Sequence, residues 1–472
     1  MIHFPCIWKH QLVKLLLLSG LFLLGGCSET RVGPDGGAPV VRQAVVEASP
    51  MNVLTAVVKA TVSSGSYGAV EFEESNQQSQ RTPFRQLSGE SWTIPVLGLH
   101  PLTAYTMRLL ARSSSGVLTV GQDLHFRTGE LPADLPAMTV TTLENPSPGF
   151  VLVGLIGAPV PPKYSVIVNN TGRIVWYRQF QSAVADFQLQ SSNTYTAYGS
   201  LAGESQHFFE MDRSGNIVRE YLSATSMETG VHELRIFTGG YALYGVDRRT
   251  MDLTSIGGAN NAEVRGMTIE LYRPSQQPFH WNTFDYLSIF DASPELDLRL
   301  PSLNPWHSNA IEIDDDGNLL VSFRNSDEIV KINSTTGGII WRLGGKKNQF
   351  TIFNDPLAGF FHQHGIRRLP SGNIILFDNG NLHVPPQSRA VEYTLNETDS
   401  TAVMVWEYRP DPPIFGGATG FAQRLPSGNT LVCFGTANRA QEVTPDGQIQ
   451  WEINLTTPGL FFYRTLRVDS LY

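Results

Sequence analysis

Three histidines stand at the beginning of similar short segments in the second half of the sequence. His232 opens HELRIFTGGYALYG, His307 opens HSNAIEIDDDGNLLVSF and His364 opens HGIRRLPSGNIILFDNG. Each segment alternates polar and apolar residues around a turn that contains glycine, which is the pattern of a β-hairpin. A neutral imidazole can act as a nucleophile, a base or a hydrogen-bond donor near neutral pH. The three histidines therefore predict a chemical site if the fold brings them together, and the alternative is a structural role in which each binds a neighbouring loop.

The segments belong to a repeat that organises most of the chain. Gly317, Gly372 and Gly428 mark the same turn, 55 and 56 residues apart. Each copy is followed by a second hairpin that ends on an aromatic strand with a tryptophan at the same place, namely Trp176, Trp341, Trp406 and Trp451. Four short antiparallel strands per unit, repeated radially, form the blades of a β-propeller, and the large aromatic side chains fill the space between blades.

The repeat predicts an all-β, six-bladed propeller over residues 133–472. The first unit, residues 149–180, lacks an innermost strand, whereas the C-terminal segment YRTLRVDSLY has no unit of its own. We expect this segment to complete the first blade and close the ring, because closure removes exposed strand edges. The first strand of each blade lines the central channel, so His232, His307 and His364 should converge at its mouth.

The preceding region predicts a separate β-sandwich over residues 41–132. Short alternating runs such as LTAVVKATV, YGAVEFEE and AYTMRLLARS are separated by turn-forming clusters. Strands of this length and spacing are typical of a small sandwich. The stretch from Leu99 to Tyr105 is similar to the Leu-x-Pro-x-Thr-x-Tyr corner of a fibronectin type III module. We expect this domain to present or space the propeller and give it no catalytic role.

The N-terminus predicts export and lipidation. Basic residues precede the apolar run LLLLSGLFLL, which is too short for a comfortable membrane span, and Leu24-Gly25-Gly26-Cys27 resembles a bacterial lipobox. We therefore expect a signal peptide over residues 1–26, a lipid on Cys27 and a flexible Gly- and Pro-rich tether over residues 27–40. These features predict an envelope lipoprotein anchored in the membrane, expected at the outer membrane and facing the periplasm.

Charge and cysteine content exclude several classes of function. The net charge of −9 argues against a nucleic-acid partner, which requires a basic surface. Of three cysteines, Cys6 leaves with the signal and Cys27 is the lipidation site, so no disulfide can form within the mature chain. Cys433 lies in a hydrophobic strand without a basic neighbour and is a poor candidate nucleophile. Whether the chain forms a homodimer stays open.

The sequence predicts no cofactor and no metal site. The acidic turn EIDDDGN at 312–318 lacks the liganding glutamate and the spacing of a calcium-binding loop, so a solvated blade turn is expected there. Three channel histidines could hold a metal ion, but no spacing pattern supports that alternative.

Ordered segments along the chain resemble the bacterial aryl-sulfate sulfotransferase family. WHSNAIEID, SFRN, VKI, WRLGG, QHG, LFDNG, SRAVEY and YRTLRV occur in this order and cover most of residues 135–472. The resemblance implies a six-bladed propeller that moves a sulfuryl group from a phenolic sulfate ester to a phenol, without a nucleotide-sulfate donor and through a sulfohistidine. The implied partners are therefore small phenolic sulfate esters and phenols.

The resemblance also assigns roles to individual residues. His307 and His364 match two active-site histidines and are the expected catalytic residues, whereas Arg324 and Arg389 match arginines expected to bind the substrate. Developing charge on the sulfuryl oxygens requires such cationic donors, and a histidine can protonate the leaving oxygen. His232 joins the expected substrate-binding set because it opens the same strand in a neighbouring blade.

The sequence departs from this family at two places. The family's sulfate-accepting histidine would fall at Thr436, Ala437 or Asn438, and an expected arginine after the DNG corner is replaced by the run that ends at His383. Three outcomes follow. Transfer uses another histidine, with His364 or His232 as candidates. His383 takes the missing arginine's place in substrate binding. Alternatively, the protein is a non-catalytic, envelope-anchored propeller that binds a ligand.

Overall fold

The computed structural model describes residues 37–472, except residues 76, 158–162, 202 and 227. The predicted signal peptide, the lipidation site at Cys27 and most of the predicted tether lie outside the described residues. The described chain is mostly β and forms eight sheets, in which almost every neighbouring pair of strands is antiparallel.

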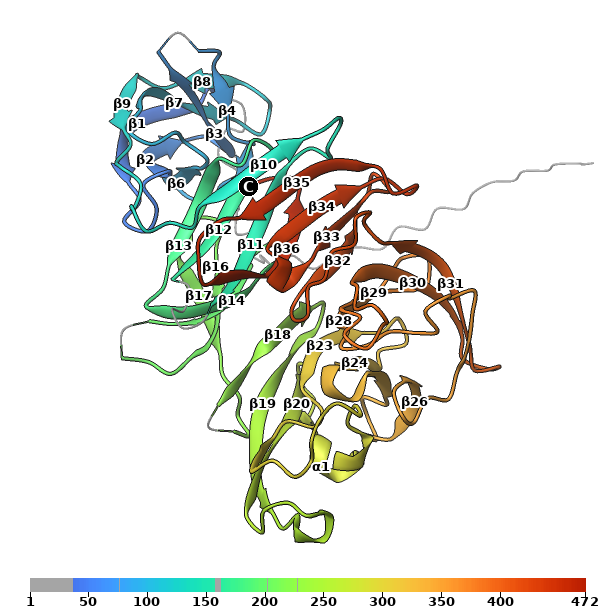
Figure 1. The fold of residues 1–472 in the computed structure, drawn as a ribbon. Helices are drawn as coiled ribbons and strands as arrows, with labels where there is room; N and C mark the ends of the chain where they lie inside the picture. The colour runs from blue at the N-terminus through green and yellow to red at the C-terminus, as the bar shows by residue number, and fades with distance from the viewer. Residues whose placement is uncertain (1–36, 76, 158–162, 202, 227) are drawn as a thin grey trace, which may run out of the picture.

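Two of these sheets form the N-terminal region (Figure 1). One contains β1 (Val40–Ala48), β2 (Ala56–Ser63) and β6 (Ser91–Val96). The other contains β3 (Tyr67–Glu74), β4 (Gln80–Arg81), β5 (Arg85–Gln86), β7 (Ala104–Arg112), β8 (Leu118–Val120) and β9 (Leu124–Arg127). Alternating side chains such as Val58, Trp92 and Met107 point inward and give the two sheets one shared hydrophobic core.

Three further sheets follow along the chain. The first contains β36 (Leu460–Val468), β11 (Phe150–Gly157), β12 (Tyr164–Asn169) and β13 (Ile174–Gln179). The second contains β14 (Ser182–Leu189), β15 (Tyr195–Ser200), β16 (His207–Met211) and β17 (Ile217–Tyr221). The third contains β18 (Thr229–Phe237), β19 (Gly240–Met251), β20 (Ala262–Tyr272), β21 (Phe279–Asn282) and β22 (Ser302–Leu303).

The last three sheets contain the repeats with the SGN and DGN turns. The fourth contains β23 (Ser308–Ile313), β24 (Leu319–Phe323), β25 (Glu328–Ile332) and β26 (Ile339–Gly344). The fifth contains β28 (His364–Arg368), β29 (Ile374–Asp378), β30 (Arg389–Asn396), β31 (Thr401–Tyr408) and β27 (Thr351–Phe353). The sixth contains β32 (Phe421–Arg424), β33 (Thr430–Cys433), β34 (Arg439–Val443), β35 (Ile449–Leu455) and β10 (Met138–Thr142), whose pairing with β35 the sequence did not predict.

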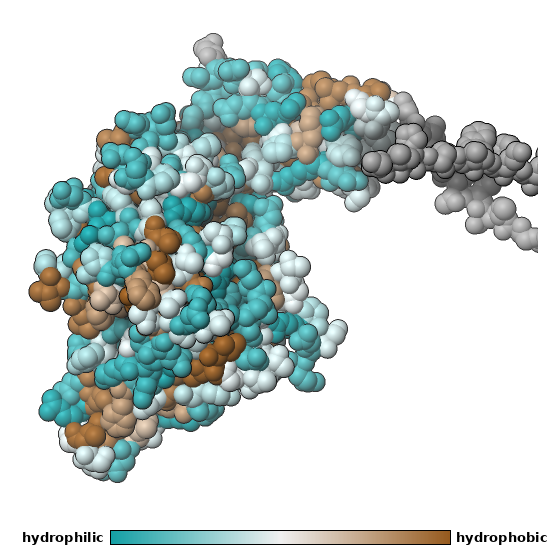
Figure 2. Space-filling model, turned by 90° about the vertical axis from the view of Figure 1, so that its right-hand side faces the viewer, coloured by the Kyte–Doolittle hydropathy of each residue, from teal (hydrophilic) through white to brown (hydrophobic). Residues whose placement is uncertain are grey.

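Helical structure within the described residues is limited to single turns. These are α1 (Thr283–Tyr286), η1 (Thr254–Ile256), η2 (Ile289–Asp291), η3 (Arg324–Ser326) and η4 (Gly435–Ala437). In this part of the chain no helix has the length and hydropathy required to cross a bilayer. In the face shown in Figure 2, hydrophilic side chains cover most of the surface and hydrophobic ones form separate patches.

The inner strands of the six sheets contact one another in series. β14 contacts β18, β18 contacts β23, β23 contacts β28 and β28 contacts β32. The C-terminal strand β36 contacts both β32 and β14 and pairs antiparallel with β11. The last strand of the chain therefore belongs to the first sheet and lies between the second and the sixth, as the red strand among green ones in Figure 1 illustrates.

Tryptophans link successive sheets through hydrogen bonds as well as packing. The indole N–H of Trp176 donates to the Arg213 carbonyl, and that of Trp406 donates to the Pro445 carbonyl in the next sheet. Trp451 of the sixth sheet donates to Asn170, in the turn between β12 and β13 of the first. Trp281 makes the same kind of link to Gly337, although the sequence repeat did not single it out.

Candidate functional site

The three histidines lie close together, and we refer to His232, His307 and His364 as the histidine cluster. His307 immediately precedes β23 and His364 is the first residue of β28, whereas His232 lies inside β18 rather than at its beginning. The ring centroids of His232 and His307 are 4.7 Å apart. His364 lies near enough to His232 for a charge on His232 to lower the pKa of His364. The neighbouring positions of β18, β23 and β28 bring them together.

Arg324 lowers the pKa of His307 and of His364 more than any other arginine does. It begins η3 directly after β24, and its backbone N–H donates to the His307 carbonyl. Its side chain donates to Asn325 Oδ1 at 2.6 Å and to the Gly417 carbonyl at 2.9 Å. Among the described residues, no carboxylate lies within 4.0 Å of its guanidinium nitrogens. Arg324 therefore holds a partly buried positive charge that neutral groups position, while the carboxylates of Glu295 and Asp327 act on it only from beyond ion-pair distance.

All three imidazoles are held in the neutral form. Burial, followed by the charges of Arg265 and Arg464, lowers the pKa of His232 from 6.5 to about 3. Burial is also the largest cause of the lowered pKa values of His307 and His364, and Arg324 adds to both effects. Uncharged rings retain a nitrogen lone pair at neutral pH, which a nucleophile or a base requires.

The partners of His232 fix its tautomer. The Tyr463 hydroxyl lies 2.9 Å from His232 Nδ1 and 2.8 Å from the His232 carbonyl oxygen. A carbonyl can only accept, so the tyrosine proton goes to the carbonyl and the hydroxyl oxygen accepts from Nδ1–H. His232 Nε2 therefore carries the lone pair.

His364 has the same tautomer for a similar reason. Its Nδ1 lies 2.6 Å from Asn379 Oδ1 and 3.1 Å from the His362 carbonyl. The Asn379 amide is oriented by its Nδ2, which donates to the carbonyls of Gly416 and Thr419. Both neighbours of Nδ1 are therefore acceptors, so Nδ1 carries the proton and His364 Nε2 is free to act as a nucleophile or base.

His307 has the opposite tautomer. Its backbone N–H donates to Asn304 Oδ1, which places Asn304 Nδ2 at 2.9 Å from His307 Nδ1. The amide N–H₂ donates, so Nδ1 accepts and the proton of this neutral ring is on Nε2. The cluster therefore combines two histidines that can accept at Nε2 with one that can donate from Nε2.

A buried ionic layer lies directly beneath His232. The Arg464 guanidinium donates to the His232 carbonyl and forms ion pairs with Asp186 at 2.9 Å and Glu233 at 3.1 Å. Arg367 also pairs with Glu233, at 3.0 Å. Because these charges are paired and hydrogen-bonded, their mutual attraction offsets part of the cost of removing them from water.

His383 and Arg389, which were predicted to bind the substrate, contact carboxylates and have no described contact with the histidine cluster. Arg389 is fully buried and pairs with Asp355, Asp378 and Glu407, each at 2.9 Å. His383 Nε2 lies 2.8 Å from the same Asp378. We refer to these five residues as the Arg389 cluster. The carboxylates of this cluster bind the side chains of Arg389 and His383, which the sequence had assigned to a substrate anion.

The turn predicted to carry the missing acceptor histidine is the 3₁₀ turn η4. There the Thr436 backbone N–H donates to the Ala418 carbonyl, and the Thr436 hydroxyl accepts from the Ala418 N–H. Arg324 binds the adjacent Gly417 carbonyl, so this turn lies beside the arginine of the site. Cys433 precedes it and is fully buried, and burial raises the pKa of its thiol to about 11. These features leave the histidine cluster as the candidate source of a nucleophile.

No group of three or more metal-ligating side chains occurs among the described residues. The acidic turn after β23 has a structural explanation, because Asp314 pairs with Lys331 at 2.9 Å and with Arg368 at 2.6 Å.

Sequence reasoning missed the residues that orient the histidines. Tyr463 and Asn379 lie inside the quoted segments YRTLRV and LFDNG but received no role, because a tautomer cannot be assigned without the partner's position. Asn304 precedes His307 by three residues, outside the repeat. Arg265 of β20, whose charge acts on His232 and His307, had no sequence signal.

The family model described as Arylsulfotransferase (ASST) matches residues 158–460, which is more than half of the chain. No curated protein matches the sequence.

Solved structures give weaker similarities. A protein of unknown function from Bacteroides caccae is 14% identical with a TM-score of 0.44, covering 69% of this chain and 100% of its own. A streptogramin B lyase is 12% identical with a TM-score of 0.37, covering 68% and 89%. A catalytically inactive virginiamycin B lyase from Staphylococcus aureus, with quinupristin, is 10% identical with a TM-score of 0.35, covering 68% and 100%. At these TM-scores the similarities carry no argument about function.

Proposed function

The chain belongs to the arylsulfotransferase (ASST) family, and from this premise we propose that it transfers a sulfuryl group from a phenolic sulfate ester to a phenol at the histidine cluster. The observation that carries the proposal is the combination of neutral imidazoles of both tautomers with Arg324, whose charge no described carboxylate pairs. A sulfate monoester is an anion, so an unpaired, partly buried guanidinium beside a lone-pair nitrogen suits it.

The architecture that we propose for this function is a six-bladed propeller over residues 133–472 closed by β36. The serial contacts of the inner strands and the link from Trp451 to the first sheet support it. We propose a fibronectin type III-like sandwich for residues 41–132, supported by two sheets around one core. In the proposed propeller, the histidine cluster lies where the inner strands β18, β23 and β28 of consecutive blades meet.

In the first half-reaction, His364 Nε2 attacks the sulfur atom and an N–S bond forms as the bond from sulfur to the aryl oxygen breaks. The electron pair of that bond leaves with the aryl oxygen as a phenolate, which accepts a hydrogen bond from His307 Nε2–H. His364 is a better nucleophile than His232, because its Nδ1–H donates to two oxygen acceptors that stabilise the developing positive charge. Beneath His232, by contrast, lies the cationic Arg464.

In the second half-reaction the oxygen of an acceptor phenol, whose proton passes to water, accepts a hydrogen bond from His307 Nε2–H. The phenol oxygen attacks sulfur, the N–S bond breaks, and its electron pair returns to His364 Nε2. Arg324 stabilises the charge on the sulfuryl oxygens in both steps, and His232 contacts the donor or the acceptor. His307 and His364 are thus the proposed catalytic residues.

The direct test is transfer from p-nitrophenyl sulfate to phenol by the purified mature chain. We expect nitrophenolate release that depends on added phenol and is lost in His364→Asn and His307→Asn. His280→Asn is the matched control, because His280 is exposed on β21 and outside the cluster. Equal turnover in the wild type and both cluster variants would contradict the proposal.

A second candidate function is ligand binding without catalysis. The observation that favours it is the turn η4, where the structure has Gly435, Thr436 and Ala437 at the place expected for the family's acceptor histidine. The same assay separates the two functions. Binding of p-nitrophenyl sulfate, weakened by Arg324→Gln and without any turnover, would favour this alternative.

We also propose that Cys27 anchors the protein to the cell envelope, at the outer membrane and facing the periplasm. The lipobox-like sequence supports this location. Cys27→Ser should move the protein from the membrane fraction to the soluble fraction. Retention of the variant in the membrane fraction would contradict lipid anchoring.

A further inference from the structure

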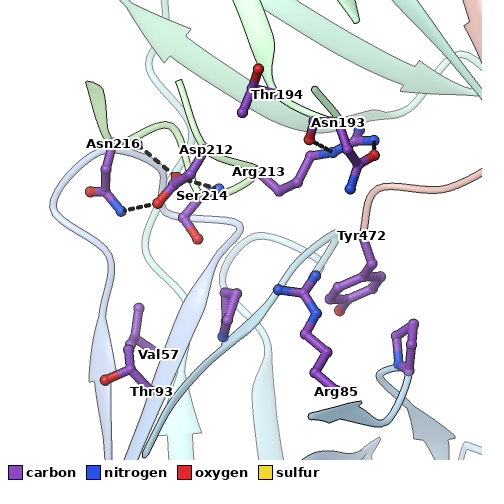
Figure 3. A pocket seen from close by; sticks show the side chains of 12 residues that line it. Val57, Arg85, Thr93, Asn193, Thr194, Asp212, Arg213, Ser214, Asn216 and Tyr472 are labelled. Carbon is purple, nitrogen blue, oxygen red and sulfur yellow. Dashed lines mark hydrogen bonds between the residues drawn. The ribbon is translucent and has the colours of Figure 1, made fainter. Parts of the chain in front are cut away.

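A cavity of about 590 Å³ lies between the N-terminal sandwich and the second sheet. None of the residues that line it belongs to the histidine cluster. From the sandwich, β2, β5 and β6 contribute to its wall, and from the second sheet the turns before β15 and between β16 and β17 do. Figure 3 shows Arg85 and Tyr472 on one side of the opening and Arg213 with Asn193 on the other. A cavity of this size matches those that hold small organic ligands.

Arg213 carries a buried charge that has no anion. It is 7% exposed, and its ring neighbour is Tyr195, over which the guanidinium lies at 4.6 Å. Its Nε donates to the Asn193 carbonyl and its Nη2 to Asn193 Oδ1, but Nη1 is buried without a hydrogen-bond partner. The Tyr195 hydroxyl also interacts with this guanidinium, but it is a neutral group, so the buried charge of Arg213 can still gain from an anion in the cavity.

Arg85 provides a second cation from the opposite wall. Its guanidinium lies 5.5 Å from the centroid of the Tyr472 ring, and within the described residues neither Arg85 nor Arg213 has a carboxylate at ion-pair distance. The Tyr472 hydroxyl forms hydrogen bonds with the backbone N–H and carbonyl of Leu97. Its ring therefore contributes a flat apolar surface to the cavity wall.

One carboxylate also lines the cavity, and it is already occupied. Asp212 Oδ1 accepts from the backbone N–H groups of Ser214 and Asn216, and Oδ2 accepts from the Asn216 side chain. These bonds close the turn between β16 and β17 and hold the carboxylate there, as the dashed lines in Figure 3 indicate. Asp212 therefore does not neutralise the two arginines.

We propose that this cavity binds a small organic oxyanion, a sulfate ester or carboxylate carried on a ring, between Arg85 and Arg213. The two guanidinium groups supply charge-assisted donors, and Tyr472 with Pro83 and Pro95 supplies a flat apolar surface for the ring. This site is separate from the proposed transfer site and does not depend on it.

Isothermal titration calorimetry on the mature chain tests the proposal with glucose 6-sulfate, p-nitrophenyl sulfate and inorganic sulfate, and with neutral p-nitrophenyl glucoside as the uncharged probe. We expect the ring-borne anions to bind more tightly than inorganic sulfate and the neutral probe not to bind. The preference between the two ring-borne anions identifies a sugar or an aryl ligand. Inorganic sulfate binding as tightly as both would overturn the ring requirement.

Substitutions locate the site. Arg85→Gln should weaken binding by about tenfold or more, because a hydrogen bond to a charged group is lost, whereas Arg85→Lys should weaken it less. Arg127→Gln is the matched control, because Arg127 is an exposed arginine of the same sandwich outside the cavity. His307→Asn must leave the affinity for glucose 6-sulfate unchanged, which separates this cavity from the transfer site, where p-nitrophenyl sulfate is expected to bind as well. Unchanged affinity in Arg85→Gln, with an unaltered unfolding midpoint, would overturn the proposal.

Discussion

Histidine and arginine meet at two places in this protein, with opposite consequences. In the histidine cluster, neutral imidazoles and Arg324 face one another without a described carboxylate at ion-pair distance. In the Arg389 cluster, His383 and Arg389 share Asp378, and two more carboxylates complete the shell of the arginine. The same residue types are therefore available to a ligand in one place and internally satisfied in the other.

The difference shows that counter-charges, rather than residue types, decide the role of a buried cation. Burial alone would raise the pKa of Asp355, but hydrogen bonds from Arg389 and Tyr393 outweigh it, so its pKa lies below its ordinary value. The ion pair of Asp355 and Arg389 therefore has a structural role, because each charge already has its partner within the protein. Arg324 has only carbonyl and amide acceptors at hydrogen-bond distance, so an anionic substrate can still pair directly with its guanidinium.

The largest effect that would sharpen this comparison is on stability. Arg389→Met should lower the free energy of unfolding by roughly 3–5 kcal/mol, because it leaves buried carboxylates without their partner. Urea denaturation of the variant against the wild type measures it. Arg127→Met serves as the control and should change stability by less than about 0.5 kcal/mol. A loss for Arg389→Met as small as that of the control would mean that the cluster is not structural.

The second effect is on transfer. His364→Asn should reduce phenol-dependent turnover of p-nitrophenyl sulfate by at least about a hundredfold, because the proposed nucleophile is removed. His383→Asn, in the other cluster, should retain turnover per folded molecule and lose stability instead. Steady-state kinetics combined with denaturation separates the two outcomes. If His383→Asn lost turnover and His364→Asn lost only stability, the Arg389 cluster would be the transfer site and the histidine cluster would be structural.

Arg324 should have a smaller effect on transfer than His364. Arg324→Gln is expected to lower kcat/KM about ten- to a hundredfold through loss of a charged hydrogen bond to the sulfuryl oxygens. Arg324→Lys should recover part of this loss because it retains the charge. If both variants matched the wild type, the unpaired guanidinium would have no part in substrate recognition.

The smallest effect concerns pH. The pKa of His232 is lowered from 6.5 to about 3 in the folded chain, so between these values the unfolded chain binds a proton that the folded chain does not. Stability should therefore fall as pH falls through this window, by about 1.4 kcal/mol per pH unit for one histidine.

Removal of His232 isolates this contribution from that of the carboxylates. Urea denaturation at pH 7.0 and 5.5 should give a loss about 1.4 kcal/mol smaller for His232→Asn than for the wild type. Identical losses would indicate that His232 is protonated as readily in the folded chain as in the unfolded one.

The repeat, the interblade tryptophans and the family resemblance were all visible in the sequence. A period of about 55 residues, fixed by Gly317, Gly372 and Gly428, predicted units that the structure has as sheets. This worked because the alternation of side chains along a strand and the glycine in a tight turn are local requirements. The convergence of His232, His307 and His364 followed from the same repeat.

Only the tertiary structure decided what the polar residues do. Asp355 comes 34 residues before Arg389 and Tyr463 comes 231 after His232, so no local pattern relates them. The tautomers of the histidines, the neutralisation of Arg389 and the cavity between Arg85 and Arg213 all depend on such distant partners. The sequence therefore determined the elements and the placement of the histidines. Their chemistry was decided by the tertiary structure, because protonation and charge compensation depend on which groups lie within a few ångströms in space.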